Sequence, residues 1–465
     1  LHDALPISIN RDSFADFEEL VEEMRKENIH LVPIIDGGVK KEDGYDVYEE
    51  GKANGYFCKD ENGEDFIIGV WPGKCCFPDM LDDKARQWFG DKYRILIDKG
   101  IDGFWNDMNE PAIFYSEKHL KEVFEKMEDY KKMNLDVNTF FEMTGMIGGI
   151  CNNPEDYASF YHNYKGRRYR HDQVHNLFGY YMTRSASEAF ERYVPEKRIL
   201  LFSRASYIGM HRFGGIWQGD NASWWSHLKM NVKMMPSLNM CGFLYTGADV
   251  GGFGADATED LVLRWLEFAV FTPLLRNHSA RGTRRQEVYR FSHVEKFADV
   301  IGVRYQILPY IYSEYMKAAL QNTMMFNPLA FLYGEDTLAG QVEDQLFIGE
   351  NIMVAPVCEQ NVSGRVVYFP EHMKELIFKN GIIEEGKVYE KGFSYVEMQM
   401  GTVHIFLREG YLFPVAKGGK CVEDVDFEDL TLYSFGKEIK PYEYYLDDGE
   451  TKDFNMETHI RILSC

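Results

Sequence analysis

A helix-then-strand pattern repeats along the first two thirds of the chain. Residues 14–27 (FADFEELVEEMRKE) carry apolar side chains at helical spacing, and the buried run HLVPIIDGG follows directly. The same order returns in ARQWFGDKYRILIDKG before IDGFWNDMNEP, and in LFGYYMTRSASEAFERYVP before RILLFSR. Near-continuous apolar strands that alternate with helices indicate a parallel sheet with helices on both faces.

The ends of the predicted strands carry polar groups. Three further apolar runs, FGGIWQGDN, MCGFLYTGADVGG and FAVFTPLLRNH, end as the first three do. Polar groups at the carboxyl ends of many parallel strands are typical of a (β/α)₈ barrel, whose active site lies at that face. A doubly wound open sheet is the alternative, but it would gather ligand groups at one switch point. We therefore expect an α/β chain with a (β/α)₈ TIM barrel over residues 1–321.

Two further regions depart from the barrel pattern. Residues 115–173 form a charged, helix-prone insert, which we expect to be a lid or subdomain at the barrel mouth. After residue 322 the pattern becomes β-rich, as in GENIMVAPV, GRVVYFP, TVHIFLREG and YEYYLDDGETKDF. The Asp448-Gly449 pair predicts a hairpin, and residues 322–465 are predicted to form an all-β C-terminal sandwich.

Composition limits the possible partners. The chain has 51 basic and 74 acidic residues and a net charge of -23, which repels nucleic acid and anionic membrane surfaces. No apolar run reaches the ~18 residues that a membrane helix needs, so we expect a soluble, cytoplasmic chain. The eight cysteines show no CxxC pairing and are predicted to be reduced thiols.

The first eight residues, LHDALPIS, lack the plan of a signal peptide. The segment ALPIS matches the translation of a common sequencing adapter, and we expect it to be a scar of sequence assembly. On this interpretation the natural protein begins upstream, and a signal peptide in the missing part stays open.

Asp107 in WNDMNEP and Asp220 in IWQGDN each end an apolar strand beside a tryptophan. Glycoside hydrolysis needs such a pair, one carboxylate ionised and one protonated. Caps or buried structural acids are the alternative, and spacing alone does not choose Asp107 over Glu110. Arg204 and His278 also follow apolar strands and are candidate ligands of sugar or carboxylate groups. The glycine run GADVGGFG lacks the lysine of a phosphate-binding loop, and no metal-ligand motif is present.

The combination of motifs resembles glycoside hydrolase family 31, the retaining α-glucosidase and α-xylosidase group. In chain order the motifs are VWPG with FPD, GFWNDMNEP, SRASYIGMHRFGGIWQGDN, YTGADVGGF, RNH, EDQLFIGENIMVAPV and REGYLFPV. The resemblance extends from about residue 28 into the C-terminal region, and its motifs are long and specific.

The resemblance implies roles for individual residues. Asp107 is the expected nucleophile and Asp220 the expected general acid/base. Matching family residues contact the sugar or line its pocket, here Arg204, Asp249, His278, Asp36, Ile34, Trp71, Met108, Trp217 and Phe253. The resemblance implies an oligosaccharide substrate with α-linked glucose, and neither a cofactor nor a metal.

The chain also departs from the family pattern. Family members carry an N-terminal β-sandwich and two earlier barrel strands, so we expect a barrel that lacks its first strands, in a C-terminal part of a longer enzyme. Retaining exo-acting α-glucosidase is the leading function. An α-xylosidase, an α-glucosyltransferase, or an inactive or carbohydrate-binding fragment are the alternatives, and linkage preference and oligomeric state stay open.

Overall fold

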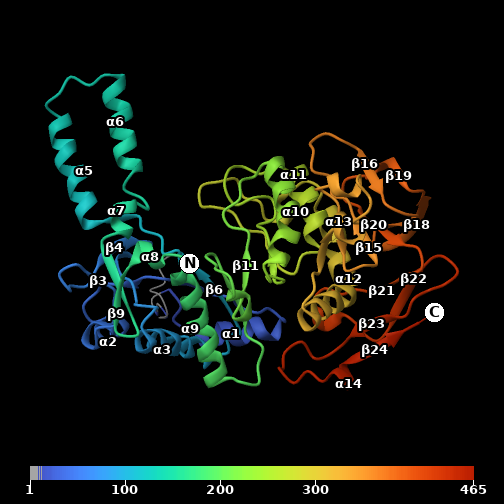
Figure 1. The fold of residues 1–465 in the computed structure, drawn as a ribbon, viewed down its shortest axis with the longest axis horizontal. Helices are drawn as coiled ribbons and strands as arrows, with labels where there is room; N and C mark the ends of the chain where they lie inside the picture. Colours follow the sequence, from blue (N-terminus) through green and yellow to red (C-terminus); the bar gives the residue numbers. More distant parts are fainter. Residues whose placement is uncertain (1–8, 10, 12, 465) are drawn as a thin grey trace. The chain divides into compact units, whose positions relative to one another are not determined.

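The computed structural model describes Ile9, Arg11 and residues 13–464. The N-terminal segment LHDALPIS lies outside these residues. The chain forms two compact units, unit 1 up to Gly214 and unit 2 from Gly215 (Figure 1). Each unit has a hydrophobic core of its own.

The centre of unit 1 is a parallel three-strand segment. Strand β6 (Gly103–Asp107) lies between β1 (Ile34–Asp36) and β10 (Leu200–Ser203). The predicted helices are present as α1 (Phe17–Lys26), α3 (Asp83–Lys92), α4 (Arg94–Ile97) and α9 (Leu177–Tyr193). The helix-then-strand prediction for this region is confirmed, because each apolar face packs into one core around Phe104 and Leu201.

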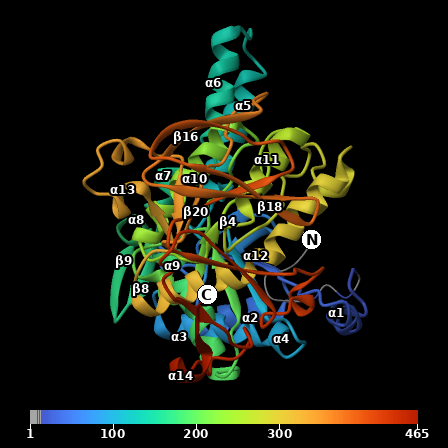
Figure 2. The same ribbon diagram turned by 90° about the vertical axis from the view of Figure 1, so that its right-hand side faces the viewer.

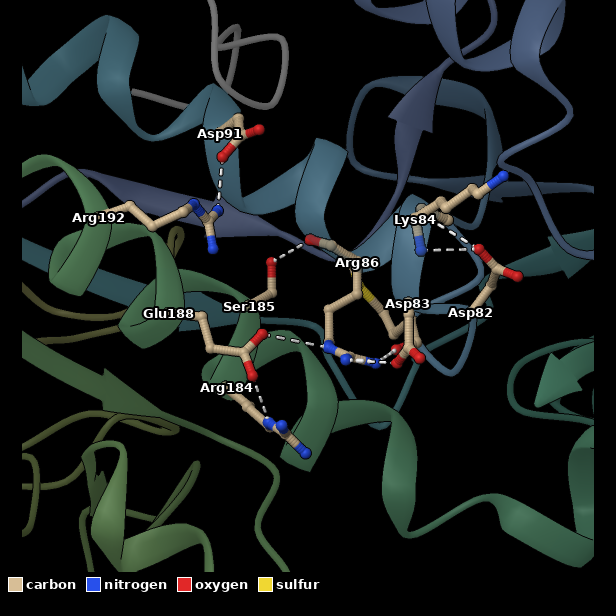
Figure 3. Close-up of polar contacts among 11 residues, drawn as sticks. Asp82, Asp83, Lys84, Arg86, Asp91, Arg184, Ser185, Glu188 and Arg192 are labelled. Atoms are coloured by element: carbon tan, nitrogen blue, oxygen red, sulfur yellow. Dashed lines mark hydrogen bonds and ion pairs between the residues drawn. The ribbon is translucent and has the colours of Figure 1, made fainter. Parts of the chain in front are cut away.

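Helices α3 and α9 pack closely through polar as well as apolar groups. Asp82 accepts hydrogen bonds from the backbone of Lys84 and Ala85 and so caps α3. Figure 3 shows the buried Arg86 between Asp83 of α3, at 2.6 Å, and Glu188 of α9, at 3.4 Å. The Ser185 hydroxyl donates to the carbonyl oxygen of Arg86 at 2.9 Å, which fixes the two helices at short range.

The insert after β6 contains a helical hairpin and a small sheet. Helices α5 (Glu117–Tyr130) and α6 (Val137–Gly148) lie side by side and extend away from the rest of unit 1 (Figures 1 and 2). Short helix α7 (Pro154–Tyr157) follows, and β3 (Lys59–Asp60), β8 (Phe160–Tyr164) and β9 (Arg167–Arg170) then form an antiparallel sheet. Helix α8 (His171–Val174) leads back to α9. A second antiparallel sheet of unit 1 contains β2 (Val39–Lys40), β4 (Ile67–Val70), β5 (Gly73–Cys76) and β7 (Tyr115–Ser116).

Unit 2 begins with two parallel strands and three long helices. Strands β11 (Gly215–Trp217) and β12 (Thr246–Gly247) pair, and α10 (Trp225–Met240), α11 (Glu259–Ala269) and α12 (Val294–Gln321) follow the predicted alternation. The prediction of a sixth strand in FAVFTPLLRNH is wrong. Its first residues complete α11, Pro273 follows, and Arg276 forms only an isolated bridge with Asp249.

The C-terminal region is rich in antiparallel strands. A six-stranded sheet has the order β13-β14-β15-β20-β17-β18, and three further strand pairs accompany it. The sheet strands are Phe326–Pro328, Leu346–Ile348, Ile352–Val354, Val403–Arg408, Met373–Lys379 and Ile382–Tyr389, in that spatial order. The pairs are β16 (Gly364–Phe369) with β19 (Gly392–Glu397), β21 (Leu412–Ala416) with β22 (Leu430–Ser434), and β23 (Tyr442–Tyr445) with β24 (Ile460–Leu463).

Strands β23 and β24 pair antiparallel on either side of the hairpin predicted at Asp448-Gly449, but these two residues do not make the whole connection. The Asp448 carboxylate instead accepts from the backbone of Glu450 and Thr451, which closes a local turn inside a longer connection between β23 and β24. The domain boundary predicted at residue 322 stays a prediction. None of the helices in the described residues is long and apolar enough to cross a membrane.

Candidate active site

Two strand ends of unit 1 bring carboxylates together. In the parallel pairing of β1 and β6, Asp36 lies opposite Asp107. Arg204 directly follows β10, the other neighbour of β6. Because the carboxyl ends of parallel strands meet at one edge of a sheet, the sequence prediction that these side chains cluster is confirmed for Asp36, Asp107 and Arg204.

Arg204 holds two carboxylates at once. Its Nη1 lies 3.0 Å from Oδ1 of Asp107. Its Nε and Nη2 donate to the two carboxylate oxygens of Glu110 at 2.6 and 2.8 Å, a bidentate contact. The backbone N–H of Met108 also donates to Asp107 Oδ1, at 2.8 Å. A cation and a donated hydrogen bond both favour the ionised form of a carboxyl group, so Asp107 is suited to carry negative charge.

Asp36 has the opposite electrostatic character. Burial and, to a smaller extent, the charge of Asp107 raise the pKa of its carboxyl, Arg204 opposes the shift, and the net value is about 7. Near neutral pH a large share of Asp36 therefore carries its proton, and a protonated carboxyl can donate a hydrogen bond to a ligand hydroxyl. The two neighbouring acids thus differ in charge because of their surroundings.

The loop after β6 is fixed by buried amide contacts. Asn109 is fully buried, donates to the Ser203 hydroxyl at 2.8 Å and accepts from the backbone of Ala205 at 3.0 Å. Met108 has a left-handed φ of 53°, and its Sδ lies 3.1 Å from Arg204 Nη2. This loop therefore holds Met108, the residue after Asp107, against Arg204, the residue after β10.

Two other predicted pocket residues lie in the same unit. Ile34 is on β1, opposite Trp105. Trp71 lies in the turn between β4 and β5, is 53% exposed, and meets Phe114 edge to face at 4.8 Å. An exposed indole ring of this kind can serve as an apolar platform for a sugar.

In unit 2 Asn221 organises the chain next to Asp220. Asp220 itself is exposed. The buried Asn221 side chain donates to the Asp249 carbonyl oxygen at 3.1 Å and accepts from the Phe253 N–H at 2.9 Å. One amide therefore joins the segments that carry Asp220, Asp249 and Phe253.

The remaining predicted residues of unit 2 form a second cluster. Asp249 is fully buried, and its Oδ1 accepts from Arg276 Nε at 2.7 Å. The Arg276 guanidinium lies 5.2 Å from the ring centre of Trp217. Phe253 and His278 stack, with ring centres 5.1 Å apart. Two sets of contacts therefore hold these residues. Arg276 joins Asp249 to Trp217, and Phe253 stacks on His278.

The glycine run between these residues has a packing role. Gly252 has φ +89°, and a Cβ there would lie 2.4 Å from the backbone nitrogen of Ser223. Only glycine fits so close an approach of two backbone segments. This accounts for the part of GADVGGFG that resembles a phosphate loop in composition alone.

Sequence reasoning missed two residues of these clusters, Asn221 and Arg276, and considered Glu110 only as an alternative to Asp107. All three stand inside the quoted motifs, next to the predicted site residues. Their place inside a motif could have identified these residues. Their contact partners lie elsewhere in the chain, and no sequence pattern predicts those partners. The distance between the carboxyl groups of Asp107 and Asp220 stays a prediction.

Two models of one known protein family match most of the chain. Residues 4–314 match the Glycosyl hydrolases family 31 TIM-barrel domain, and residues 322–413 match the Glycosyl hydrolase family 31 C-terminal domain. These matches confirm the predicted fold class, a barrel domain followed by a largely β C-terminal domain.

Individual relatives agree with the family match. Alpha-glucosidase 2 of Bacillus thermoamyloliquefaciens is 30% identical over 460 residues, which cover 98% of this chain and 53% of that protein. Alpha-glucosidase of Saccharolobus solfataricus is 29% identical over 86% of this chain and 55% of its own length. The glucose complex of a Flavobacterium johnsoniae GH31 dextranase has the same fold, with a TM-score of 0.75 at 22% identity over 94% of this chain and 50% of that one. The chain spans about half the length of these relatives.

Proposed function

The chain belongs to glycosyl hydrolase family 31, and we propose that the protein carrying it is a retaining, exo-acting α-glucosidase. One observation supports the assignment of Asp107 most directly. Arg204 binds Glu110 through two hydrogen bonds and still reaches Asp107 at 3.0 Å. Glu110 is thereby engaged as a structural partner, while Asp107 stands at the strand end as a stabilised carboxylate.

The proposed reaction is a double displacement on a terminal α-linked glucose. Asp107 attacks the anomeric carbon while Asp220 protonates the leaving oxygen, and Asp220 then activates the water that releases the sugar. Arg204 stabilises Asp107 as an anion before attack. Asp36, with its raised pKa, donates a hydrogen bond to a sugar hydroxyl. The substrate class is supported by the names of the two relatives above, both called α-glucosidases.

A trapping experiment tests the nucleophile. We expect a fluorinated α-glucosyl inhibitor to label one peptide, with the sugar on Asp107, because a retaining enzyme forms a covalent glycosyl intermediate. Peptide mass mapping reads the label. Asp107→Asn should abolish labelling, and Glu110→Gln serves as the comparison because it removes a neighbouring carboxylate. A label on Glu110 would show that Asp107 is not the nucleophile. Faster hydrolysis of nitrophenyl α-xyloside than of nitrophenyl α-glucoside would show that the enzyme is an α-xylosidase.

The same mechanism predicts a distance. The carboxyl groups of Asp107 and Asp220 should lie roughly 5 to 6 Å apart, because a nucleophile and an acid/base on one glycosidic bond need that separation. A crystal structure with a bound inhibitor measures it. A separation of about 9 Å would leave room for a water and indicate inversion of configuration instead.

A further inference from the structure

A column of three imidazoles runs through unit 1 from a buried carboxylate. His162 Nδ1 lies 2.8 Å from Asp79 Oδ1, His162 Nε2 lies 2.8 Å from His171 Nδ1, and His171 Nε2 lies 2.8 Å from His175 Nδ1. Asp79, His162 and His171 are all buried. We call these four residues the imidazole column. Neither the glycosidase mechanism nor the sequence motifs assign a role to its histidines.

For neutral rings, the surroundings of Asp79 set the direction of the hydrogen bonds along the column. Its Oδ2 accepts from the backbone N–H of Asn163 at 2.6 Å, so Asp79 is bound as an acceptor. A neutral His162 then carries its proton on Nδ1 and offers the lone pair of Nε2. His171 in turn donates from Nδ1, and so does His175, because the bond at one ring nitrogen sets the tautomer at the other.

Burial keeps the middle of the column uncharged. It lowers the pKa of His171 far below its usual range, and the neighbouring histidines act in the same direction. Burial also lowers the pKa of His175, although the charge of Glu110 opposes that shift. The column is therefore a continuous chain of polar contacts whose central member, His171, is uncharged.

The outer end of the column contacts the loop after β6. The Tyr157 ring lies 4.9 Å from that of His175 and 5.6 Å from that of His171, measured between ring centres. The Tyr157 hydroxyl lies 3.0 Å from the carbonyl oxygen of Pro111, the residue after Glu110. It also lies 2.9 Å from Asn152 Oδ1, which accepts from the Ile113 N–H. Tyr157 thus connects the column to both sides of residue 112.

We propose that the imidazole column and Tyr157 position the loop of residues 108–113, and through Glu110 the Arg204 side chain that holds Asp107. His171, His175 and Tyr157 are then positioning residues for the nucleophile, a role that rests on the proposed function. The column anchors a loop that carries part of the site to strand β8 and helix α8 of the chain after it. A fixed tautomer makes this anchor directional, since each imidazole fits only one orientation.

A metal site is the competing interpretation of the inner end. The ligand atoms of Cys58, Asp79 and His162 lie within 4.8 Å of one another. A metal on His162 Nδ1 would move the proton of His162 to Nε2 and reverse every hydrogen bond of the column. Burial raises the pKa of the Cys58 thiol well above its ordinary value, which disfavours the thiolate that a metal requires. The two interpretations therefore predict opposite tautomers.

Nitrogen-15 NMR of the histidine-labelled chain decides between them without any activity measurement. We expect protonated Nδ1 and unprotonated Nε2 at His162, His171 and His175, with signals assigned from single His→Gln variants. Protonated Nε2 at His162 and His171, or zinc that stays bound stoichiometrically after dialysis, would overturn the proposal. Because this result needs no substrate, it stands even if the proposed function fails.

Kinetics of the active protein test the positioning role. Tyr157→Phe keeps the ring and loses the hydroxyl, and it should lower kcat ~10- to 100-fold with little change in KM, since small misplacement of a reacting group is costly. His175→Asn keeps a donor near the Nδ1 position and should retain more activity than His175→Leu. The matched control is His404→Gln in β20, another histidine hydrogen-bonded to a buried carboxylate, Glu375. Unchanged kcat in Tyr157→Phe and in His175→Leu, with a wild type that hydrolyses the substrate, would overturn the role.

Discussion

The most informative residues are two neighbouring acids with different protonation. Asp36 and Asp107 face each other across β1 and β6, yet Arg204 contacts Asp107 directly while burial raises the pKa of Asp36 to about 7. Two ionised carboxyl groups on these paired residues would repel each other, which is costly. One proton on Asp36 removes that repulsion and leaves Asp107 as the anion.

This arrangement predicts a pH-dependent stability difference. The pKa of Asp36 is raised on folding, so between about pH 4 and pH 7 the folded chain binds a proton that the unfolded chain releases. The part of the unfolding free energy that this proton contributes is therefore fully present below about pH 4, and it is lost as the pH rises through about 7. Relative to wild type, Asp36→Asn should gain about 2 kcal/mol of unfolding free energy between pH 5 and pH 8.

Urea unfolding of both proteins across that range measures this gain. Asp98→Asn, a change at an exposed carboxylate that pairs with Arg94, is the control. Parallel curves for wild type and Asp36→Asn would contradict the raised pKa.

At the same scale the sequence predicted which residues form the clusters better than it predicted their partners. Asp107 and Arg204 could be chosen because each follows an apolar strand. The bidentate contact of Arg204 with Glu110 could not, since the two residues are 94 positions apart and only the pairing of β6 with β10 brings them together. Asp249 and Arg276 show the same limit.

At the scale of elements, periodicity succeeded where one structure fits the pattern. Residues 14–27 and 177–193 have a helical apolar spacing, and the structure has helix α1 (Phe17–Lys26) within the first range and α9 (Leu177–Tyr193) over the second. The run FAVFTPLLRNH failed because its apolar residues continue the helical face of EDLVLRWLEFA, so α11 uses the first of them. A short apolar run does not distinguish a strand from the end of a buried helix.

Two helical glycines give a matched test of packing between elements. A Cβ on Gly90 of α3 would lie 2.4 Å from the carbonyl oxygen of Ser185 on α9, whereas Gly145 of α6 has open space around it. Gly90→Ala should cost roughly 1–3 kcal/mol because the two helices must separate. Gly145→Ala should stabilise the chain by about 0.5–1 kcal/mol, because alanine favours a helix. Urea unfolding followed by circular dichroism measures both, and equal effects would show that α3 and α9 are not in tight contact.

At the scale of the whole molecule, one core crosses the predicted domain boundary at residue 322. Buried residues of α10, α11 and α12 belong to the same cluster as Leu346, Leu376 and Phe413. Polar contacts cross as well. The Tyr310 hydroxyl donates to Ile348 O at 2.5 Å, Tyr442 donates to Glu314 at 2.8 Å, and the Tyr445 N–H donates to Ser313 at 3.1 Å.

A fragment of residues 322–465 should therefore fail to fold by itself, because removal of α12 exposes the apolar face of its strands and leaves buried polar groups without partners. Residues 215–465, which contain the complete cores of unit 2, should retain more structure. Amide dispersion in NMR spectra and the cooperativity of thermal unfolding compare the two. A cooperative transition in the shorter fragment would show that the β-rich C-terminal region is independent of the helices.

The close backbone approach at Gly252 has a consequence for the gene. Every amino acid other than glycine brings a β-carbon into a space that the Ser223 backbone already fills. All four glycine codons share their first two bases, so the third base can drift without effect, whereas any missense change at the other two meets the same obstacle. Natural variation at this codon should consequently be confined to silent substitutions.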